Sequence, residues 1–270
     1  TYGGVHADLL KELGATEFVG YECLSADAEV CAIVRNGERV DSLSAGEQGE
    51  VVLNVTPFYA EMGGEVGDTG TITADGVELQ VTDTKAPEKG LVCHVATVAS
   101  GVLTVGMAVS AQVDVKRRAC IARNHTCTHI LHAALRQVLG AHVKQAGSYV
   151  GPDRLRFDFT HFESVTPEQL KQVEELANSV IMSATATNIF ETSLAKAREE
   201  GVTALFGEKY GDVVRVVKVG DFSSELCGGC HVANTAEIGL VKIVSESSVG
   251  ANLRRIEAFT SYDALTYLNG

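Results

Sequence analysis

The sequence predicts an α+β fold, in which a small antiparallel β-barrel is followed by a two-layer α+β domain. Between residues 18 and 115, short β-prone runs alternate with Gly, Asn and Asp turns, a spacing typical of a small barrel. Over residues 116–260, helical patterns alternate with apolar strand-like runs, which is typical of helices packed on a mostly antiparallel sheet. We expect residues 1–17 to form a helical lead-in, and residues 261–270 the start of a C-terminal helix or a linker.

Five strand patterns define the expected barrel, and a short helix over residues 5–13 precedes them. The strands are predicted at Ala28–Arg35, Glu50–Val55, Gly76–Thr84, Leu91–Val98 and Val109–Val115. Asn36-Gly37 and Asp75-Gly76 are typical of hairpin turns, which need residues that tolerate positive φ.

The second domain is expected to begin with one helix over residues 116–139, which Gly140 ends. Thr166-Pro167-Glu168-Gln169 has the pattern of a capping box and predicts a second helix up to about Thr185. A shorter helix near Leu194–Glu200 ends at Gly201. The strands are predicted at Gln145–Val150, Leu155–Thr160, Val213–Val219, Ile238–Val244 and Arg254–Thr260.

The charge of the chain is unevenly distributed. The formal net charge is −13, and residues 1–115 carry all of it, with 5 Lys/Arg against 18 Asp/Glu. Residues 116–270 carry 17 of each and are neutral, with basic clusters at Lys116-Arg117-Arg118, at Arg154 and Arg156, and at Arg254-Arg255. A polyanion is therefore expected to meet the second domain, although each cluster alone is more typical of a solvated face.

The sequence shows neither a signal peptide nor a run of about 18 apolar residues, so we expect a cytoplasmic protein without a membrane partner. Its seven cysteines are an odd number without a spaced framework, which favours reduced thiols. Because the first residue is Thr1 and not Met, we expect a piece of a longer chain.

Two motifs predict a metal site. Residues four apart on a helix lie on one face, so His125 and His129 can bind one ion together. Cys227 and His231 repeat the four-residue interval in a loop with two glycines. Three imidazoles and one thiolate suit Zn²⁺. Thr126 stands where a zincin peptidase needs Glu, which argues against a peptidase, and a purely structural zinc site remains the alternative.

Two further cysteines lie beside these motifs. Cys127 is two residues from each helix histidine and points away from both, so we interpret it as a small buried hydrophobic residue. Cys230 could replace Cys227 or His231 as a ligand. Cys227 and Cys230 also have the spacing of a redox dithiol, but the surrounding βαβ pattern is missing.

Several motifs in order resemble the editing region of alanyl-tRNA synthetase and the related free-standing AlaX-type deacylases. They are Phe58-Tyr59-Ala60-Glu61-Met62-Gly63-Gly64-Glu65-Val66-Gly67-Asp68-Thr69-Gly70, Asn124-His125-Thr126-Cys127-Thr128-His129, Val143-Lys144-Gln145-Ala146-Gly147-Ser148, Glu225-Leu226-Cys227-Gly228-Gly229-Cys230-His231-Val232 and Arg254-Arg255-Ile256-Glu257-Ala258. The resemblance covers nearly the whole chain and implies a translation-protein-like barrel followed by a zinc-dependent editing domain. Cys230 stands where the family often has Thr, and Cys127 where Ala is frequent.

The resemblance also implies an activity, namely hydrolysis of the ester that joins Ser or Gly wrongly to tRNA(Ala). It implies that Gln145 lines the amino-acid pocket, that Thr128 lies beside the substrate, and that Zn²⁺ is held by His125, His129, Cys227 and His231. A site that hydrogen-bonds the serine hydroxyl discriminates well against alanine. The chain shows no ATP-binding signature, so we expect the domain that charges tRNA with alanine to lie outside it.

Alternatives remain at this stage. The chain could be a free-standing deacylase, an RNA-binding module whose zinc is structural, or a dithiol oxidoreductase. Four protein ligands would fill a tetrahedral ion, so the zinc either expands to five ligands, exchanges one of its ligands, or only shapes the pocket. Thr128 could simply bond back to its helix, Gln145 could be an ordinary strand residue, and the Met62-Gly63-Gly64 loop is either an RNA contact or a turn. His132 is expected to support the metal ligands, while the remaining histidines are expected to be ordinary residues: His6, His94, His142 and His161.

Overall fold

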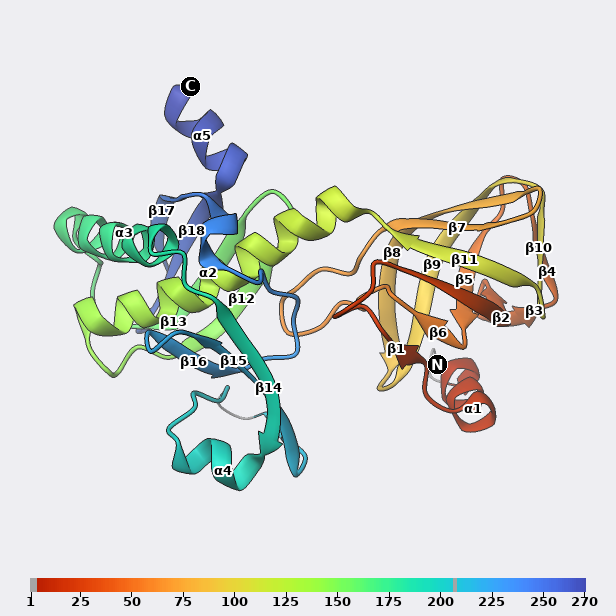
Figure 1. The fold of residues 1–270 in the computed structure, drawn as a ribbon, viewed down its shortest axis with the longest axis horizontal. Helices are drawn as coiled ribbons and strands as arrows, with labels where there is room; N and C mark the ends of the chain where they lie inside the picture. Colours follow the sequence, from red (N-terminus) through yellow and green to blue (C-terminus); the bar gives the residue numbers. More distant parts are fainter. Residues whose placement is uncertain (1–3, 206–207) are drawn as a thin grey trace. The chain divides into compact units, whose positions relative to one another are not determined.

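The computed structural model describes residues 4–205 and 208–270, which form two compact units (Figure 1). One unit comprises Thr1–Met62 and Val66–Arg118, and the other comprises Gly63–Glu65 and Ala119–Gly270. Residues 1–3 of the expected lead-in and residues 206–207 of the expected second domain lie outside the described residues. The fold class predicted from the sequence, a small antiparallel barrel and an α+β domain, is confirmed.

The first unit is a closed antiparallel barrel. Its strands pair in the order β11-β7-β8-β9-β5-β2, and β11 pairs back onto β2 to close the ring. The barrel strands are β2 (Ser25–Arg35), β5 (Gln48–Leu53), β7 (Gly70–Ala74), β8 (Val77–Glu88), β9 (Leu91–Ser100) and β11 (Ala108–Val113). Buried and exposed residues alternate along β8 and β11, so that one face of each strand fills the barrel interior.

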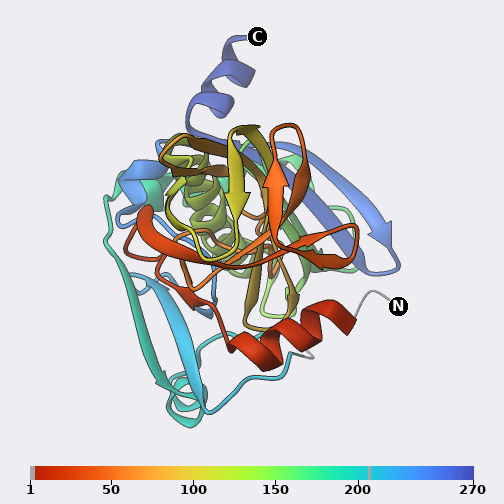
Figure 2. The same ribbon diagram turned by 90° about the vertical axis from the view of Figure 1, so that its right-hand side faces the viewer.

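Short elements complete this unit. They are α1 (Gly4–Leu13), β1 (Glu17–Phe18), β3 (Glu38–Val40), β4 (Ser42–Ser44), β6 (Val55–Thr56) and β10 (Val102–Thr104). Helix α1 lies beside the barrel strands (Figure 2), and its Leu9 packs in a small core with Val52 and Leu91. Asn36 and Gly37 both have positive φ in the turn from β2 to β3, as the hairpin prediction requires.

The second unit is built around α2 (Val115–Leu139). The part of this helix from Ala119 onward belongs to the second unit. Apolar side chains of α2 pack with α3 (Pro167–Met182) against an antiparallel sheet in one continuous core. The sheet has the order β12-β13-β18-β17, formed by β12 (Gln145–Val150), β13 (Leu155–Thr160), β17 (Val241–Gly250) and β18 (Leu253–Thr260). Helix α2 is thus apolar on the side that faces the sheet. The side that carries His125 and His129, its histidine face, is left for other contacts.

A second, three-stranded sheet carries the later motif. It has the order β14-β15-β16, with β14 (Thr187–Ser193), β15 (Val213–Val219) and β16 (Ser223–Leu226). The remaining elements are α4 (Leu194–Glu199), the 3₁₀ helix η1 (Thr235–Ile238) and α5 (Ser261–Asn269). None of the described helices is long and apolar enough to cross a membrane.

The sequence-based boundaries need several corrections. Strand β7 in the glycine-rich stretch, and strands β14 and β16, were not predicted, because each is short or lacks clear alternation. Val115 begins α2 and does not end a strand. The capping box at Thr166 is confirmed, but α3 ends at Met182, before Ala184, which has φ +51°. The strand predicted from Ile238 begins only at Val241, because Ile238 belongs to η1.

Candidate metal centre

His125 and His129 lie one turn apart on the histidine face of α2, and both side chains are buried. Their ring centroids are 5.4 Å apart, close to the separation expected for neighbouring positions on one helix face. The loop after β16 brings His231 against them, with ring centroids 4.5 Å from His125 and 4.7 Å from His129.

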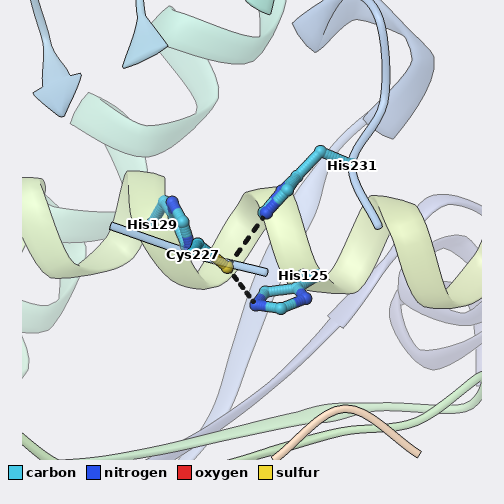
Figure 3. A group of neighbouring side chains, drawn as sticks. All are labelled: His125, His129, Cys227 and His231. Carbon is cyan, nitrogen blue, oxygen red and sulfur yellow. Dashed lines mark hydrogen bonds between the residues drawn. The ribbon is translucent and has the colours of Figure 1, made fainter. Parts of the chain in front are cut away.

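Cys227 is the centre of this group (Figure 3). Its Sγ lies 3.4 Å from Nε2 of His125 and 3.3 Å from Nε2 of His231. One donor atom from each of the four residues His125, His129, Cys227 and His231 lies within 4.8 Å of the others. The structure therefore brings together all four residues that the sequence nominated as ligands.

The donor set and its spacing fit zinc. Zn–S and Zn–N bonds of about 2.3 and 2.0–2.1 Å at a tetrahedral angle place sulfur and nitrogen about 3.5 Å apart, close to the two separations seen here. Nδ1 of His129 is buried and has no hydrogen-bond partner among the described residues. A buried imidazole nitrogen without a partner is costly unless a ligand or ion satisfies it. Softer sulfur and imidazole donors favour Zn²⁺ over Mg²⁺ or Ca²⁺.

Two groups orient the candidate ligands. Glu65 Oε1 lies 2.6 Å from Nδ1 of His125 and also accepts a hydrogen bond from the backbone N–H of Cys230. Thr126 Oγ1 lies 3.0 Å from Nδ1 of His231 and accepts from the N–H of Val232. In both imidazoles Nδ1 is thus engaged, which directs Nε2 toward the sulfur, as is typical of histidine ligands.

The local electrostatics favour a cation among these side chains. Burial raises the pKa of the Cys227 thiol, but the three neighbouring imidazoles outweigh burial and hold this pKa well below its usual range. Burial lowers the pKa of His125, yet the thiolate and Glu65 raise it to about 10. Burial and the neighbouring His125 lower the pKa of His231 to about 3. Without an ion the thiolate draws a proton onto His125, and a metal cation can replace that proton.

The loop that carries Cys227 needs a glycine at position 229. A Cβ on Gly229 would lie only 2.0–2.2 Å from ring atoms of His125 and 2.9 Å from Glu65 Oε1. Arg215 on β15 donates to the carbonyl oxygens of Cys227 and Gly229 and so fixes the course of the loop. The close approach of loop backbone to imidazole is therefore a condition for the four donors to meet.

A cavity of about 320 Å³ adjoins this group. Gln145 and Glu225 line it, and Gln145 Nε2 donates to Ser148 Oγ. Glu225 Oε2 lies 3.5 Å from Nε2 of His129, so one carboxylate touches both the candidate metal ligands and the cavity. Burial raises the pKa of Glu225, but His129 and His132 outweigh it and lower the pKa, which keeps the carboxylate charged.

The other residues nominated from the sequence are placed as follows. Thr128 is buried and its hydroxyl donates to the carbonyl oxygen of His125, which is the bond back to the helix that the sequence left open. Cys127 is buried in the core of the unit, as predicted. Cys230 is buried and lies outside the group of four donors. Gly63 and Gly64 both have positive φ, in agreement with a turn.

Sequence reasoning missed two carboxylates at this centre. Glu65 lies in the glycine-rich stretch, more than fifty positions before His125, and nothing in its local pattern connects it with the helix. Glu225 lies two residues before Cys227, so the acidic residue beside a thiol ligand was a usable signal. His132, expected to support the ligands, lies with Nδ1 2.5 Å from Glu225 Oε1.

Comparison with known proteins agrees with this geometry. Residues 4–117 match the family described as tRNA synthetases class II (A), and residues 214–257 match the threonyl and alanyl tRNA synthetase second additional domain. The chain is 55% identical to the alanine–tRNA ligase of Pelotomaculum thermopropionicum over 96% of its own length, and 52% identical to that of Desulforamulus reducens over 98%. The alanine–tRNA ligase of Bacillus anthracis is 51% identical over 94% of this chain.

The chain spans about three tenths of the length of these relatives, with 29%, 30% and 29% of each covered. The second additional domain matches the stretch that contains Cys227 and His231. The chain therefore belongs to the alanyl-tRNA synthetase family and corresponds to the segment that contains its editing region.

Proposed function

We propose that this segment hydrolyses the ester in Ser-tRNA(Ala) and Gly-tRNA(Ala), as part of a cytoplasmic alanine–tRNA ligase that charges the same tRNA elsewhere in its chain. The observation that carries the proposal is the convergence of three imidazoles and one thiol beside a cavity that Gln145 lines. Such a cavity is small enough to enclose an amino acid and part of a nucleotide.

In this proposal His125, His129, Cys227 and His231 hold one Zn²⁺. The bound ion supplies positive charge that anchors the substrate and polarises its ester carbonyl. Glu65 keeps Nδ1 of His125 occupied, so that the imidazole presents Nε2 to the ion. Thr128 lies on the ligand helix and its hydroxyl donates to the carbonyl oxygen of His125, which makes it a positioning residue.

In this proposal Gln145 and Glu225 bind the amino-acid part of the substrate. The side-chain amide of Gln145 offers both a donor and an acceptor to a serine hydroxyl. The charged carboxylate of Glu225 is the natural partner for the α-ammonium group of an aminoacyl ester. Alanyl and glycyl esters both leave the amide of Gln145 without its hydroxyl partner, so the seryl ester is expected to bind better than either.

Deacylation of purified Ser-tRNA(Ala) and Ala-tRNA(Ala) tests the proposal. We expect release of serine but little release of alanine, and we expect Gln145→Leu to reduce the rate on Ser-tRNA(Ala) by about tenfold or more. Gln172→Leu, on the exposed face of α3, is the matched control and should leave the rate unchanged. Failure of the zinc-loaded wild type to release serine would overturn the proposal.

A second candidate function is favoured by one observation. Four protein donors fill a tetrahedral ion, which is typical of a structural zinc, so the unit could bind RNA without cutting an ester. The two candidates differ in a simple way. A structural zinc predicts tRNA binding with no serine released at any protein concentration, whereas the editing function predicts turnover of Ser-tRNA(Ala).

A further inference from the structure

A second cavity of about 240 Å³ lies next to the cavity beside the metal centre. The two cavities share His132, Arg136, Thr203 and Glu225 as lining residues. Lys144 lines the first cavity and Ser224 the second. The first cavity alone is larger than a serine side chain requires, and two cationic side chains, Arg136 and Lys144, line it together with Gln145 and Glu225.

Arg136 and Lys144 form no ion pair or side-chain hydrogen bond within residues 4–205 and 208–270. Two arginines of the basic clusters predicted from the sequence are paired instead. Arg254 pairs with Glu246 at 2.6 Å, and Arg154 pairs with Glu257 at the same distance. The basic clusters that the sequence offered as polyanion sites are thus largely neutralised, while two cations at the cavity remain available for an anion.

His132 gives a second, independent indication of a ligand. Its side chain is only 3% exposed, and Nδ1 is engaged by Glu225 at 2.5 Å. Because the carboxylate accepts, Nδ1 must donate, and Nε2 is the ring nitrogen that is left for another partner. Nε2 is buried without a partner among the described residues, as is Ser224 Oγ in the adjoining cavity. Buried polar atoms facing a cavity are typical of sites that a polar ligand completes.

We propose that Arg136 and Lys144 bind the phosphate that joins the 3′-terminal nucleotide of the RNA to the nucleotide before it. This inference rests on the proposed function, because it names the part of the substrate that lies beyond the amino acid. The ester is attached to the terminal ribose, so a phosphate must follow within one nucleotide of the ester. The unpartnered Nε2 of His132 offers a hydrogen bond to a hydroxyl of the sugar that lies between ester and phosphate, since a hydroxyl can either donate or accept.

The test compares two substrates that share the ester but differ in the phosphate, namely Ser-tRNA(Ala) and 3′-O-seryl-adenosine. We expect Arg136→Gln to raise KM for Ser-tRNA(Ala) by about tenfold with kcat little changed, and Lys144→Gln to act in the same direction. Neither variant should alter kcat/KM for seryl-adenosine. Each should also lower the slope of log KM against log salt by about 0.7, the value for one contact on a single strand.

Two controls accompany these variants. Lys171→Gln removes the same charge from an exposed position on α3 and should change neither substrate. Arg136→Lys keeps the positive charge, so its KM for Ser-tRNA(Ala) should be close to that of the wild type. If Arg136→Gln slows both substrates by the same factor, or slows neither, the phosphate contact is refuted.

Failure of the proposed function would look different, because the wild type would then release serine from neither substrate. The phosphate contact would still be decided by fluorescence anisotropy with an uncharged RNA that ends in CCA. Weaker binding by Arg136→Gln than by Lys171→Gln would support the contact, and equal binding would overturn it.

Discussion

The two units differ in how completely their buried polar groups are hydrogen-bonded. In the first unit, the buried Arg118 at the start of α2 donates to both oxygens of Asp68 and to the carbonyl oxygens of Gly20 and Pro57. Within residues 4–205 and 208–270, every buried side-chain nitrogen or oxygen that lacks a hydrogen-bond partner belongs to the second unit. These atoms are His129 Nδ1, His132 Nε2, Arg156 Nε, His161 Nε2 and Ser224 Oγ.

We interpret the paired polar groups as serving stability and the unpaired ones as serving ligand binding. Paired polar groups inside the barrel define one structure and need nothing from outside. Three of the unpaired atoms belong to residues of the candidate metal group or of the cavity lining, where an ion and a substrate can complete them: His129 Nδ1, His132 Nε2 and Ser224 Oγ. We therefore expect substitutions of paired polar groups in the first unit to change stability without changing metal content, and substitutions of the four candidate ligands to change metal content.

The largest effect is expected for Cys227→Ala. Loss of the thiolate removes the anion that attracts the cation, so zinc content should fall from about one equivalent per chain to nearly none, with serine release falling at least about 100-fold. Metal analysis of the purified protein and the deacylation assay measure the two quantities.

Cys230→Ala is the matched control, because Cys230 lies three residues away and outside the group of four donors. It should retain zinc. Loss of zinc in Cys230→Ala together with retention in Cys227→Ala would show that the wrong thiol has been assigned.

Arg118→Met is the corresponding test in the barrel. It leaves the carboxylate of Asp68 buried without its guanidinium, which should cost about 3–5 kcal/mol of barrel stability. Hydrogen exchange of the amides in β5 and β9 reports this loss, while zinc content should stay at the wild-type value. Unchanged exchange in these strands would contradict the role of the pair, and loss of zinc would contradict the separation of the two units.

Acid should weaken the barrel through His94. Burial lowers the pKa of this side chain from 6.5 to about 4, although its bond to the carbonyl oxygen of Val51 opposes burial. Between these values the unfolded chain binds a proton that the folded barrel excludes, so stability falls as the pH falls through this window, by up to about 3 kcal/mol.

His94→Gln should remove most of this pH dependence from the hydrogen exchange of β5 and β9, after correction for intrinsic exchange. The variant should also be less stable at neutral pH, because it weakens the bonds to Val51 and Thr56. An unaltered pH dependence in His94→Gln would assign the acid sensitivity to another group.

The smallest effect is expected for Gly229→Ala. The added Cβ pushes on the ring of His125 and on Glu65, so zinc affinity should fall by about 10- to 100-fold without loss of the fold. Gly211→Ala is the control, since a Cβ there meets no atom within 4 Å. Competition with a zinc chelator measures both, and equal affinities would show that the loop moves aside at no cost.

Local patterns predicted much of the second unit. The capping box at Thr166 is present, and strands β12, β13 and β15 have the predicted ends, because turn and cap residues adjoin each of them. The meeting of His125 and His129 follows from helical spacing alone. That Cys227 and His231 join these two histidines was predicted from the residue types and the repeated four-residue interval, and the resemblance to a family supported it, because spacing alone cannot show that segments a hundred residues apart meet.

The sequence did not reveal the groups that act across long distances. Glu65 was read as part of the barrel, but Gly63–Glu65 belong to the second unit, where Glu65 contacts His125. The cavity also depends on tertiary structure, since Arg136 and Lys144 belong to different elements and carry no motif. Short strands such as β7 gave too little alternation to detect.

X-ray absorption at the zinc edge can show whether three imidazoles and one thiolate bind a single zinc ion. We expect one sulfur at about 2.3 Å and three nitrogen neighbours at about 2.0–2.1 Å, with the sulfur lost in Cys227→Ala. Two sulfur neighbours, or a shell of oxygen and nitrogen without sulfur in the wild type, would contradict it.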